Sequence, residues 1–157
     1  MIETESMHHA PIDWSSTLGG ILAEFGCQTG TIHRSTPEGG LLQLICQIGV
    51  PESLLEKITR IPFGKGIAGA AAERKEPVTL CNLQQDLGGV AKPDARKTGV
   101  SGSLAVPIFA TGSDEVIGTL GIGKVNPHEF SAEEQRRLEA AARKIAGLFE
   151  NKAACDD

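Results

Sequence analysis

Apolar residues recur every three or four positions near the start of the sequence, and this spacing predicts an amphipathic helix over residues 13–25. Asp13 is its expected N-cap and Gly26 its expected stop. The apolar face consists of Trp14, Leu18, Ile21, Leu22 and Phe25. Gly19 and Gly20 each weaken the helix by up to about 1 kcal/mol relative to alanine. Packing against a neighbouring element must therefore hold this helix in place.

The last predicted helix has the clearest start signal, a capping box formed by Ser131 and Glu134. An apolar stripe with helical periodicity follows it: Leu138, Ala141, Ala142, Ile145, Leu148 and Phe149. Glutamates near the start and basic residues toward the end suit the helix dipole. We therefore expect a long amphipathic helix near the C-terminus.

Short apolar runs between the two end helices predict six strands and two further helices. The strands are expected at 27–34, 41–49, 59–62, 78–81, 101–111 and 115–125, and the helices at 51–58 and 66–74. Pro107 indicates a bulge in its strand, or a position whose N–H the sheet does not need. Because turn signals make hairpins the dominant connection, the expected fold class is α+β, with a mostly antiparallel sheet and both end helices on one face.

The chain reads as one domain over residues 13–150, a common domain size. Residues 1–12 are expected to form a disordered N-terminal arm, and residues 151–157 a frayed tail. Residues 82–100 are the longest irregular stretch. A loop of that length inside a compact domain is usually functional or mobile.

Charge and composition narrow the classes of partner. The net charge is −5, there is no dense Lys/Arg stretch, and the aromatics are five Phe and one Trp, which argues against a nucleic-acid partner. The sequence has neither a long apolar run nor the basic start of a signal peptide, so no membrane partner is expected and the expected location is cytoplasmic.

The four cysteines are far apart in the sequence and form no CxxC pair. Cys27, Cys46 and Cys81 lie in apolar strand-like segments, so we interpret them as small buried hydrophobes rather than catalytic or metal-binding groups. Cys155 lies in the polar tail. Free thiols are expected for all four in a reducing compartment.

Gly64, Gly66 and Gly69 fit the pattern G-x-G-x-x-G, which in a dinucleotide-binding fold follows a buried strand and opens a βαβ crossover. Here the preceding strand is short, and the next strand ends in Cys81 and Asn82 rather than an acid. The pattern therefore predicts a tight strand-to-helix turn. Free N–H groups at the start of helix 66–74 can then hold a ligand oxygen or solvent.

Four segments in a fixed order carry a resemblance to a known family: IPFGKGIAGAAAERKEPVTLCNL, GVSGSLAVPI, EVIGTLGIGK and FSAEEQRRLEAAARKIA. Over residues 13–150 the sequence resembles the GAF domain family. The resemblance implies an antiparallel sheet of about six strands with the terminal helices on one face. It also implies a ligand pocket on the other face, under helix 66–74 and the 82–100 loop, in a sensor that often dimerises through its terminal helices.

Subfamily features are matched only in part. Lys124, Phe130 and Glu134 agree with cyclic-nucleotide-binding members, but Gly123 and Gln135 depart from their pattern, which leaves Lys124 and Glu134 as a structural ion pair. The 82–100 loop lacks the cysteine of bilin-binding members. His33 and His128 are each more often satisfied core or surface residues than haem ligands. No cofactor and no metal are therefore expected.

Three functions stay open. The first is a sensor that binds a small anionic or carboxylate ligand and acts through its own dimer or a signalling partner. Its candidate ligand-binding residues are Asp94, Arg96, Lys97, Ser101, Ser103, Cys81, and Ile67 and Ala68 through their N–H groups. The second is a thiol enzyme resembling free methionine sulfoxide reductases, with Cys81 as the one candidate nucleophile near the loop. The third is a ligand-free dimerisation scaffold.

Overall fold

The computed structural model describes residues 12–80 and 101–150, which form one antiparallel sheet with helices on both faces. The helices are α2 (Trp14–Phe25), α3 (Glu52–Ile58), α4 (Gly66–Arg74) and α5 (Ala132–Glu150). The strands are β1 (Thr29–Ser35), β2 (Leu41–Ile48), β3 (Arg60–Pro62), β4 (Val78–Leu80), β5 (Gly102–Phe109) and β6 (Val116–Lys124). The predicted α+β fold with six strands is confirmed.

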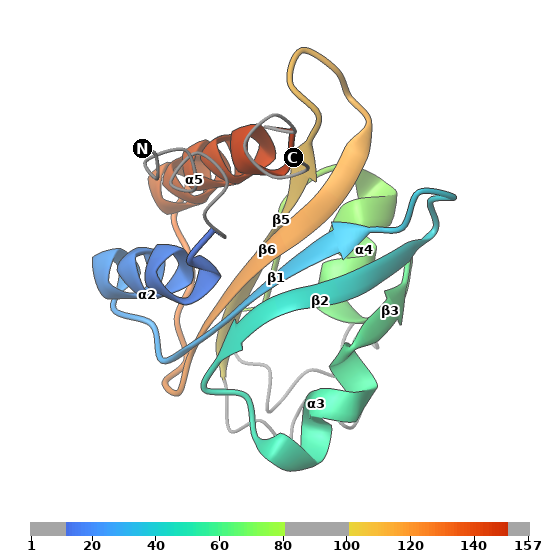
Figure 1. Ribbon diagram of the computed structural model, residues 1–157. Helices are drawn as coiled ribbons and strands as arrows, with labels where there is room; N and C mark the ends of the chain where they lie inside the picture. The colour runs from blue at the N-terminus through green and yellow to red at the C-terminus, as the bar shows by residue number, and fades with distance from the viewer. Residues whose placement is uncertain (1–11, 81–100, 151–157) are drawn as a thin grey trace, which may run out of the picture.

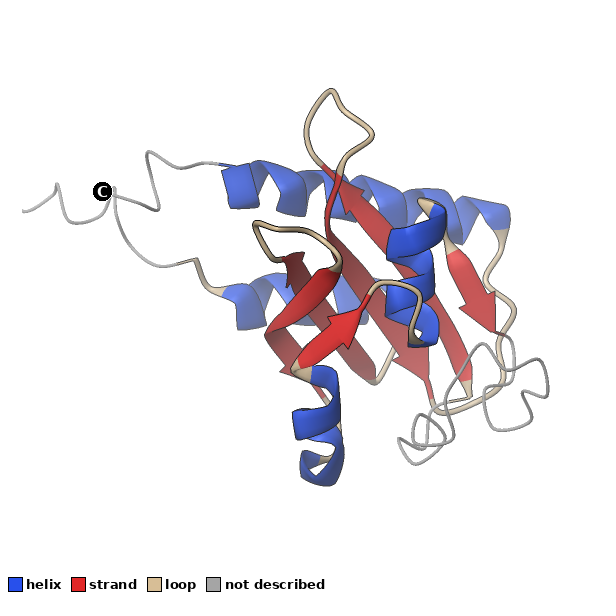
Figure 2. Cartoon of the chain, turned by 90° about the vertical axis from the view of Figure 1, so that its right-hand side faces the viewer, coloured by secondary structure: helices blue, strands red, loops and turns tan. Residues whose placement is uncertain are grey.

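The strand order in the sheet is β3-β2-β1-β6-β5-β4. Hairpins join β1 to β2 and β5 to β6, and β1 pairs with β6 in the centre. Figures 1 and 2 show α2 and α5 together on one face, while α3 and α4 lie on the other. The placement of both end helices on one face agrees with the expectation from the sequence.

The pairing register assigns each residue of the central strands to one face. Ile32 lies opposite Leu120, and Leu120 lies opposite Val106. All three are fully buried in the core beneath α2 and α5. Their neighbours Thr31 and Gly121 must face the other way, because side chains alternate along a strand. The sheet therefore has one large apolar face and one face of small and polar residues.

The core on the α2 and α5 side is built from the apolar stripes seen in the sequence. Its buried members include Leu18, Leu22, Phe25, Leu138, Ala142, Ile145 and Phe149. Cys27 and Cys46 pack against this core but are only half-buried, so they are less enclosed than the sequence suggested. Burial raises the pKa of the Cys27 thiol to about 11. Cys27 is therefore a protonated, inert thiol at neutral pH.

Capping residues start both end helices as predicted. Asp13 accepts a hydrogen bond from the backbone N–H of Ser16 at 3.1 Å, and Gly26 ends α2 with φ of 65°. Glu134 accepts from the N–H of Ser131 at 2.8 Å, and the Ser131 hydroxyl accepts from the N–H of Glu134 at 3.1 Å. This reciprocal pair is the expected capping box.

The expected ion pair between Lys124 and Glu134 is wrong, because the carboxylate of Glu134 bonds elsewhere. Its partners are the Ser131 N–H and Nε2 of His128, which lies 3.1 Å away. The hydrogen bond from the Ser131 backbone lowers the pKa of Glu134, with further lowering from His128 and, at longer range, from the charge of Lys124. The start of α5 thus holds Glu134 in its charged form.

Gly20 weakens α2 without any compensating contact, since a Cβ added there would meet nothing within 4 Å. We expect Gly20→Ala to raise the free energy of unfolding by about 0.5–1 kcal/mol, because alanine loses less backbone entropy on folding. Urea titration followed by circular dichroism measures this. Gly26→Ala is the matched control and should lower stability, because its φ of +65° strains any residue with a Cβ. An unchanged midpoint for Gly20→Ala would contradict the prediction.

Pro107 lies on β5 beyond the stretch that β4 covers, since β4 pairs only with residues from Ser103 to Ala105. The register shift of β5 falls one residue later, between Ile108 and Phe109. Pro107 is therefore not the site of a bulge. It occupies a position whose N–H the sheet does not need, because no described strand pairs with it on the β4 side.

The G-x-G-x-x-G segment forms the predicted turn from β3 into α4. Gly64 and Gly66 take φ values of +87° and +65°. The N–H of Gly64 donates to the backbone oxygen of Gly69 at 2.7 Å, which closes the turn. Since β3 pairs antiparallel with β2, this is not a dinucleotide-binding crossover.

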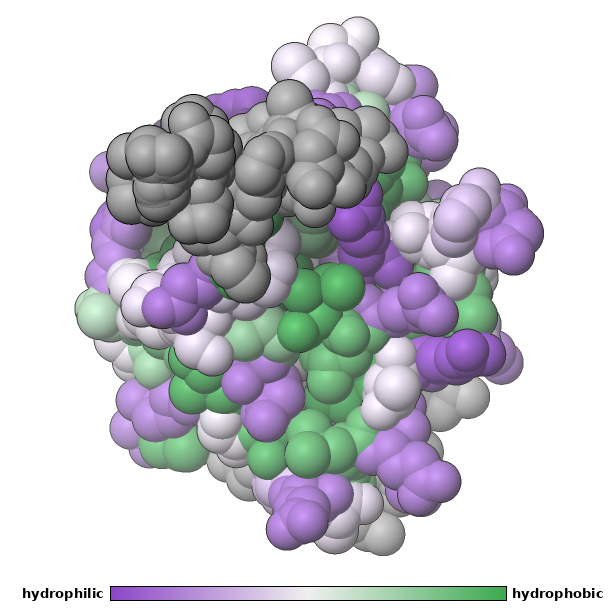
Figure 3. Space-filling model, in the orientation of Figure 1, coloured by the Kyte–Doolittle hydropathy of each residue, from purple (hydrophilic) through white to green (hydrophobic). Residues whose placement is uncertain are grey.

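The outer surface near β2 is partly apolar. Ile45 of β2 is 37% exposed, and Figure 3 shows apolar surface gathered over β2 and toward α3.

Within the described ranges, no helix combines the length and apolar character needed to cross a membrane.

Candidate functional site

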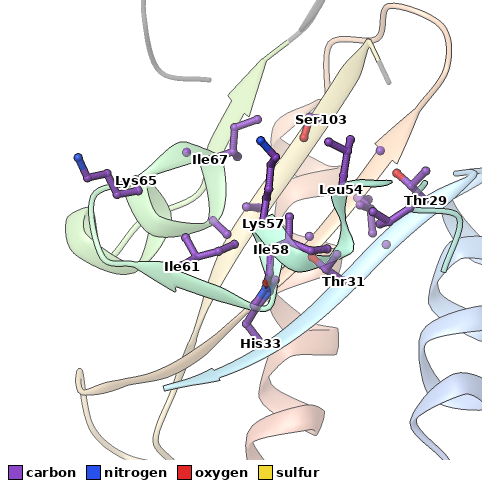
Figure 4. Close-up of a pocket in the computed structure, with 18 of the residues that line it drawn as sticks. Thr29, Thr31, His33, Leu54, Lys57, Ile58, Ile61, Lys65, Ile67 and Ser103 are labelled. Atoms are coloured by element: carbon purple, nitrogen blue, oxygen red, sulfur yellow. The ribbon is translucent and has the colours of Figure 1, made fainter. Parts of the chain in front are cut away.

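A cavity of about 480 Å³ lies on the sheet face opposite α2 and α5. Its floor comes from β1, β6 and β5, and its walls come from α3, β3 and α4, as Figure 4 shows. Binding sites for small molecules commonly have volumes of about 300–1,000 Å³. The cavity therefore has the size of a site for one small organic molecule.

The floor of the cavity is ordered in three rows by the strand register. The first row holds Thr29, Gly123 and Ser103, and the second holds Thr31, Gly121 and Ala105. In the third row only His33 lines the cavity; its register partners Thr119 and Pro107 lie outside the described lining. A Cβ added at Gly121 would meet only the Thr31 hydroxyl at 3.1 Å and the Leu104 backbone oxygen at 3.9 Å. Small residues in the second row thus leave the middle of the sheet uncovered.

The walls are apolar and come from short elements. Leu54 and Ile58 of α3, Ile61 of β3 and Ile67 of α4 line the space above the floor. Ala70 and Ala71 are buried against Ala105 and Val78, so α4 packs closely on one side of the sheet. We attribute the remaining space to this arrangement, because α4 packs over β5, β6 and β4 while the last residue of α3, Ile58, meets His33 of β1.

The charged residues among the described lining are all basic. They are Lys57, Arg60 and Lys65, and the described lining includes no Asp or Glu. In Figure 4 the Lys57 side chain extends among the pocket residues, whereas Lys65 points away from them. The rim of the cavity therefore attracts negative charge.

The start of α4 adds to this positive character. Gly66, Ile67 and Ala68 form its first turn and all line the cavity. Lys65, the N-cap, makes no side-chain hydrogen bond to the helix, and the first turn has no acidic residue. Unpaired N–H groups and the positive end of the helix dipole favour an anion at such a position.

His33 is the one buried ionisable residue of the described cavity lining, with a side chain only 1% exposed. Its Nε2 lies 2.9 Å from the backbone oxygen of Ile58. Its Nδ1 has no hydrogen-bond partner. Burial lowers the pKa of His33, and the hydrogen bond to Ile58 offsets part of this effect. The expectation of a fully satisfied histidine is therefore only half right.

Comparison with known proteins decides the family. The model of the GAF domain family matches residues 15–150, which is most of the chain. This chain is a GAF domain. No curated protein sequence matches it.

Solved structures share the fold of this GAF domain at low sequence identity. The GAF domain of a phosphoenolpyruvate-protein phosphotransferase from Coxiella burnetii has a TM-score of 0.73 and 22% identity, over 96% of this chain and 90% of that one. Free methionine-R-sulfoxide reductase from Neisseria meningitidis has a TM-score of 0.70 and 21% identity, over 96% and 84%. A GAF domain region from Geobacter sulfurreducens has a TM-score of 0.71 and 18% identity, over 86% and 89%. At these identities the likeness shows the fold alone.

The site residues predicted from the sequence divide into three groups. Ser103, Ile67 and Ala68 line the cavity of the GAF domain. Ser101 is buried but does not belong to the described lining. Cys81, Asp94, Arg96 and Lys97 lie outside the described residues, so their roles stay predictions, as do the arm and the tail.

Several lining residues escaped the sequence interpretation, above all Thr29, Thr31 and His33 on β1 and Lys57 on α3. A signal for the floor existed in the alternation T-x-T-x-H over residues 29–33, together with Gly121 and Gly123 two positions apart. It could not be used without knowing that β1 and β6 pair in the centre of the sheet. Nothing local marks Lys57, which reaches the cavity only because of where α3 packs.

Proposed function

We propose that this GAF domain is a sensor that binds a small organic anion in the cavity between the sheet and helices α3 and α4. One observation carries the proposal: an apolar cavity of about 480 Å³ whose described charged lining is entirely basic. The start of α4, which has no side-chain cap, supports it, because its first-turn residues line the same space and the first turn of a helix favours an anion. A carboxylate or phosphate at the rim, attached to an apolar body in the cavity, satisfies both features.

Relatives of the same fold give this proposal a precedent. The structure of the Neisseria meningitidis reductase was determined in complex with its substrate. A domain of a putative two-component sensor histidine kinase from Sinorhizobium meliloti has a TM-score of 0.68 and 16% identity, over 90% of this chain and 91% of that one. The fold therefore accompanies both small-molecule binding and signalling in other proteins.

The sensor would pass its signal through the opposite face of the sheet, in a homodimer joined by α2 and α5 or in contact with a signalling partner in the cytoplasm. Thr31 borders the cavity, and the next residue, Ile32, is fully buried beneath α2 and α5. A ligand that moves β1 would thus act directly on the core under these helices. This close connection supports an output through the α2 and α5 surface.

The reductase alternative depends on a reactive thiol. Neither Cys27 nor Cys46 belongs to the described cavity lining, and the pKa of Cys27 is raised to about 11. Cys81 lies outside the described residues. We therefore favour the sensor. If the unchanged protein reduced free methionine sulfoxide and Cys81→Ser did not, the reductase would be favoured instead.

Native mass spectrometry of freshly purified protein tests the proposal first, because it reports retained small molecules and the subunit count together. Titration calorimetry then compares carboxylates with their neutral amides. We expect the acids to bind at least about tenfold more tightly, and Lys57→Gln to remove most of that difference, because a charged hydrogen bond contributes about 1.5–3 kcal/mol. Lys144→Gln, on the exposed face of α5, is the matched control. Equal affinity for acids and amides would refute the proposal that the ligand is an anion. A monomeric mass would refute the proposal that the domain forms a homodimer.

A further inference from the structure

Two buried side-chain atoms of the described residues have no hydrogen-bond partner: Nδ1 of His33 and Oγ1 of Thr119. Each residue is only 1% exposed. They occupy directly opposed positions on β1 and β6, so both side chains project from the same face of the sheet. Buried polar atoms in proteins are nearly always paired. Two unpaired atoms side by side therefore point to a third group that binds between them.

The hydrogen bond of His33 determines what that third group must be. A backbone carbonyl can only accept, so Nε2, at 2.9 Å from the oxygen of Ile58, must carry the hydrogen. Nδ1 of the neutral ring is then an acceptor and needs a donor. Burial lowers the pKa of His33, which keeps the ring neutral. The Thr119 hydroxyl is more adaptable, because it can donate or accept.

The position of His33 relates this acceptor to the ligand cavity. His33 lines the cavity and belongs to the third row of its floor, whereas Ser103 belongs to the first. Thr29 and His33 are four positions apart on β1, so the first and third rows lie about 13 Å apart along the strand. Figure 4 shows His33 and Ser103 at opposite ends of the group of pocket side chains, with the tip of Lys57 nearer Ser103.

We propose that His33, with Thr119 beside it in the sheet, forms a hydrogen-bonding subsite at the inner end of the cavity, which selects organic anions that carry an N–H or O–H group away from their acidic group. This inference rests on the proposed function, since it assigns the anionic group to the basic rim. The ligand donates to Nδ1 of His33, which lines the cavity, and its hydroxyl or amine reaches past this ring to Oγ1 of Thr119, which lies outside the described lining. The ligand class is thereby narrowed to hydroxy- or amino-substituted organic acids with an apolar middle.

Matched pairs of carboxylates test the subsite. Hydroxy-carboxylates of graded chain length and 4-hydroxyphenyl carboxylates are titrated beside the same compounds with methyl in place of the hydroxyl group. At least one hydroxyl compound should bind about tenfold or more tightly than its methyl partner, as expected when a buried acceptor is left unpaired. His33→Phe should abolish the preference, so that the hydroxyl compound and its methyl partner bind this variant with equal affinity.

A second variant and a measurement on the free protein test the subsite even if His33→Phe does not fold. Thr119→Val, which has nearly the same shape, should reduce the preference without removing it. Nitrogen NMR of the free protein should show hydrogen on Nε2 and none on Nδ1 at neutral pH. A protonated Nδ1, or an unchanged preference in both variants, overturns the subsite.

The outcomes separate this inference from the proposed function. Equal binding of hydroxyl and methyl carboxylates, with weak binding of amides, overturns the subsite and leaves the anion sensor standing. Absence of binding by every acid in the panel, together with native mass spectra free of any retained molecule, overturns the proposed function and the subsite with it.

Discussion

Replacing Gly121 with valine should abolish the binding of organic acids while leaving the domain folded. Gly121 lies in the middle row of the cavity floor, between Thr31 and Ala105. A Cβ there meets the Thr31 hydroxyl at 3.1 Å, and that side chain can rotate away. The two valine methyl groups would then occupy the space where the apolar body of the ligand must lie. We expect affinity to fall at least 100-fold, about 2.7 kcal/mol.

Stability should change little in Gly121→Val, because valine favours strands and the added carbons enter a cavity rather than a packed core. Calorimetric titration with the tightest acid found for the unchanged protein measures binding, and urea unfolding measures stability. Gly147→Val on the exposed face of α5 is the control, since a Cβ there meets nothing within 4 Å. Unchanged binding in a folded Gly121→Val protein would place the ligand outside this cavity.

Gly69→Ala should destabilise the domain by about 3 kcal/mol, at the upper end of the cost of overpacking. The added Cβ would lie 2.5 Å from the backbone oxygen of Pro62 and 3.1 Å from the backbone nitrogen of Gly64. Neither atom can rotate away, because both belong to the turn that leads from β3 into α4. The 2.7 Å hydrogen bond between the Gly64 N–H and the Gly69 oxygen would also be strained.

Gly66→Ala separates this overlap from the strain of the backbone. Gly66 has φ of +65° but nothing within 4 Å of an added Cβ, so alanine there should cost only about 1 kcal/mol. Urea unfolding of both variants, with the slope of the transition held in common, measures the difference. If Gly69→Ala proved no less stable than Gly66→Ala, the close approach of α4 to the turn would not hold in solution.

The glycine pattern also shows how a motif acquires its meaning from its surroundings. Gly64, Gly66 and Gly69 match a dinucleotide fingerprint letter by letter, yet they serve a turn and a close contact in an antiparallel fold. Two of the three supply positive φ, and the third removes a side chain where helix and strand end meet. In the sequence, only the flanking strands distinguished this turn from a dinucleotide site: the preceding strand is short, and the following strand does not end in an acid.

Local patterns were sufficient to predict the elements of this protein. Asp13, Gly26 and the Ser131–Glu134 capping box act within one helical turn, so their effect can be predicted from neighbouring residues alone. The same holds for the alternation that places the strands and for the Ala-rich helix over 66–74, whose observed bounds are Gly66–Arg74. The antiparallel character followed from short connections, because hairpins leave little choice of direction.

The binding site depended on contacts between residues far apart in the chain, which only the tertiary structure decided. His33 meets the carbonyl of Ile58 and stands beside Thr119, and Lys57 reaches the cavity from a helix of seven residues. These contacts require the order β3-β2-β1-β6-β5-β4 and the approach of the end of α3 to β1. Neither is encoded in any short segment, because strand order is set by the summed burial of both sheet faces. The sequence alone determined which elements form; the pairing of β1 with β6 determined which side chains face one another across the cavity.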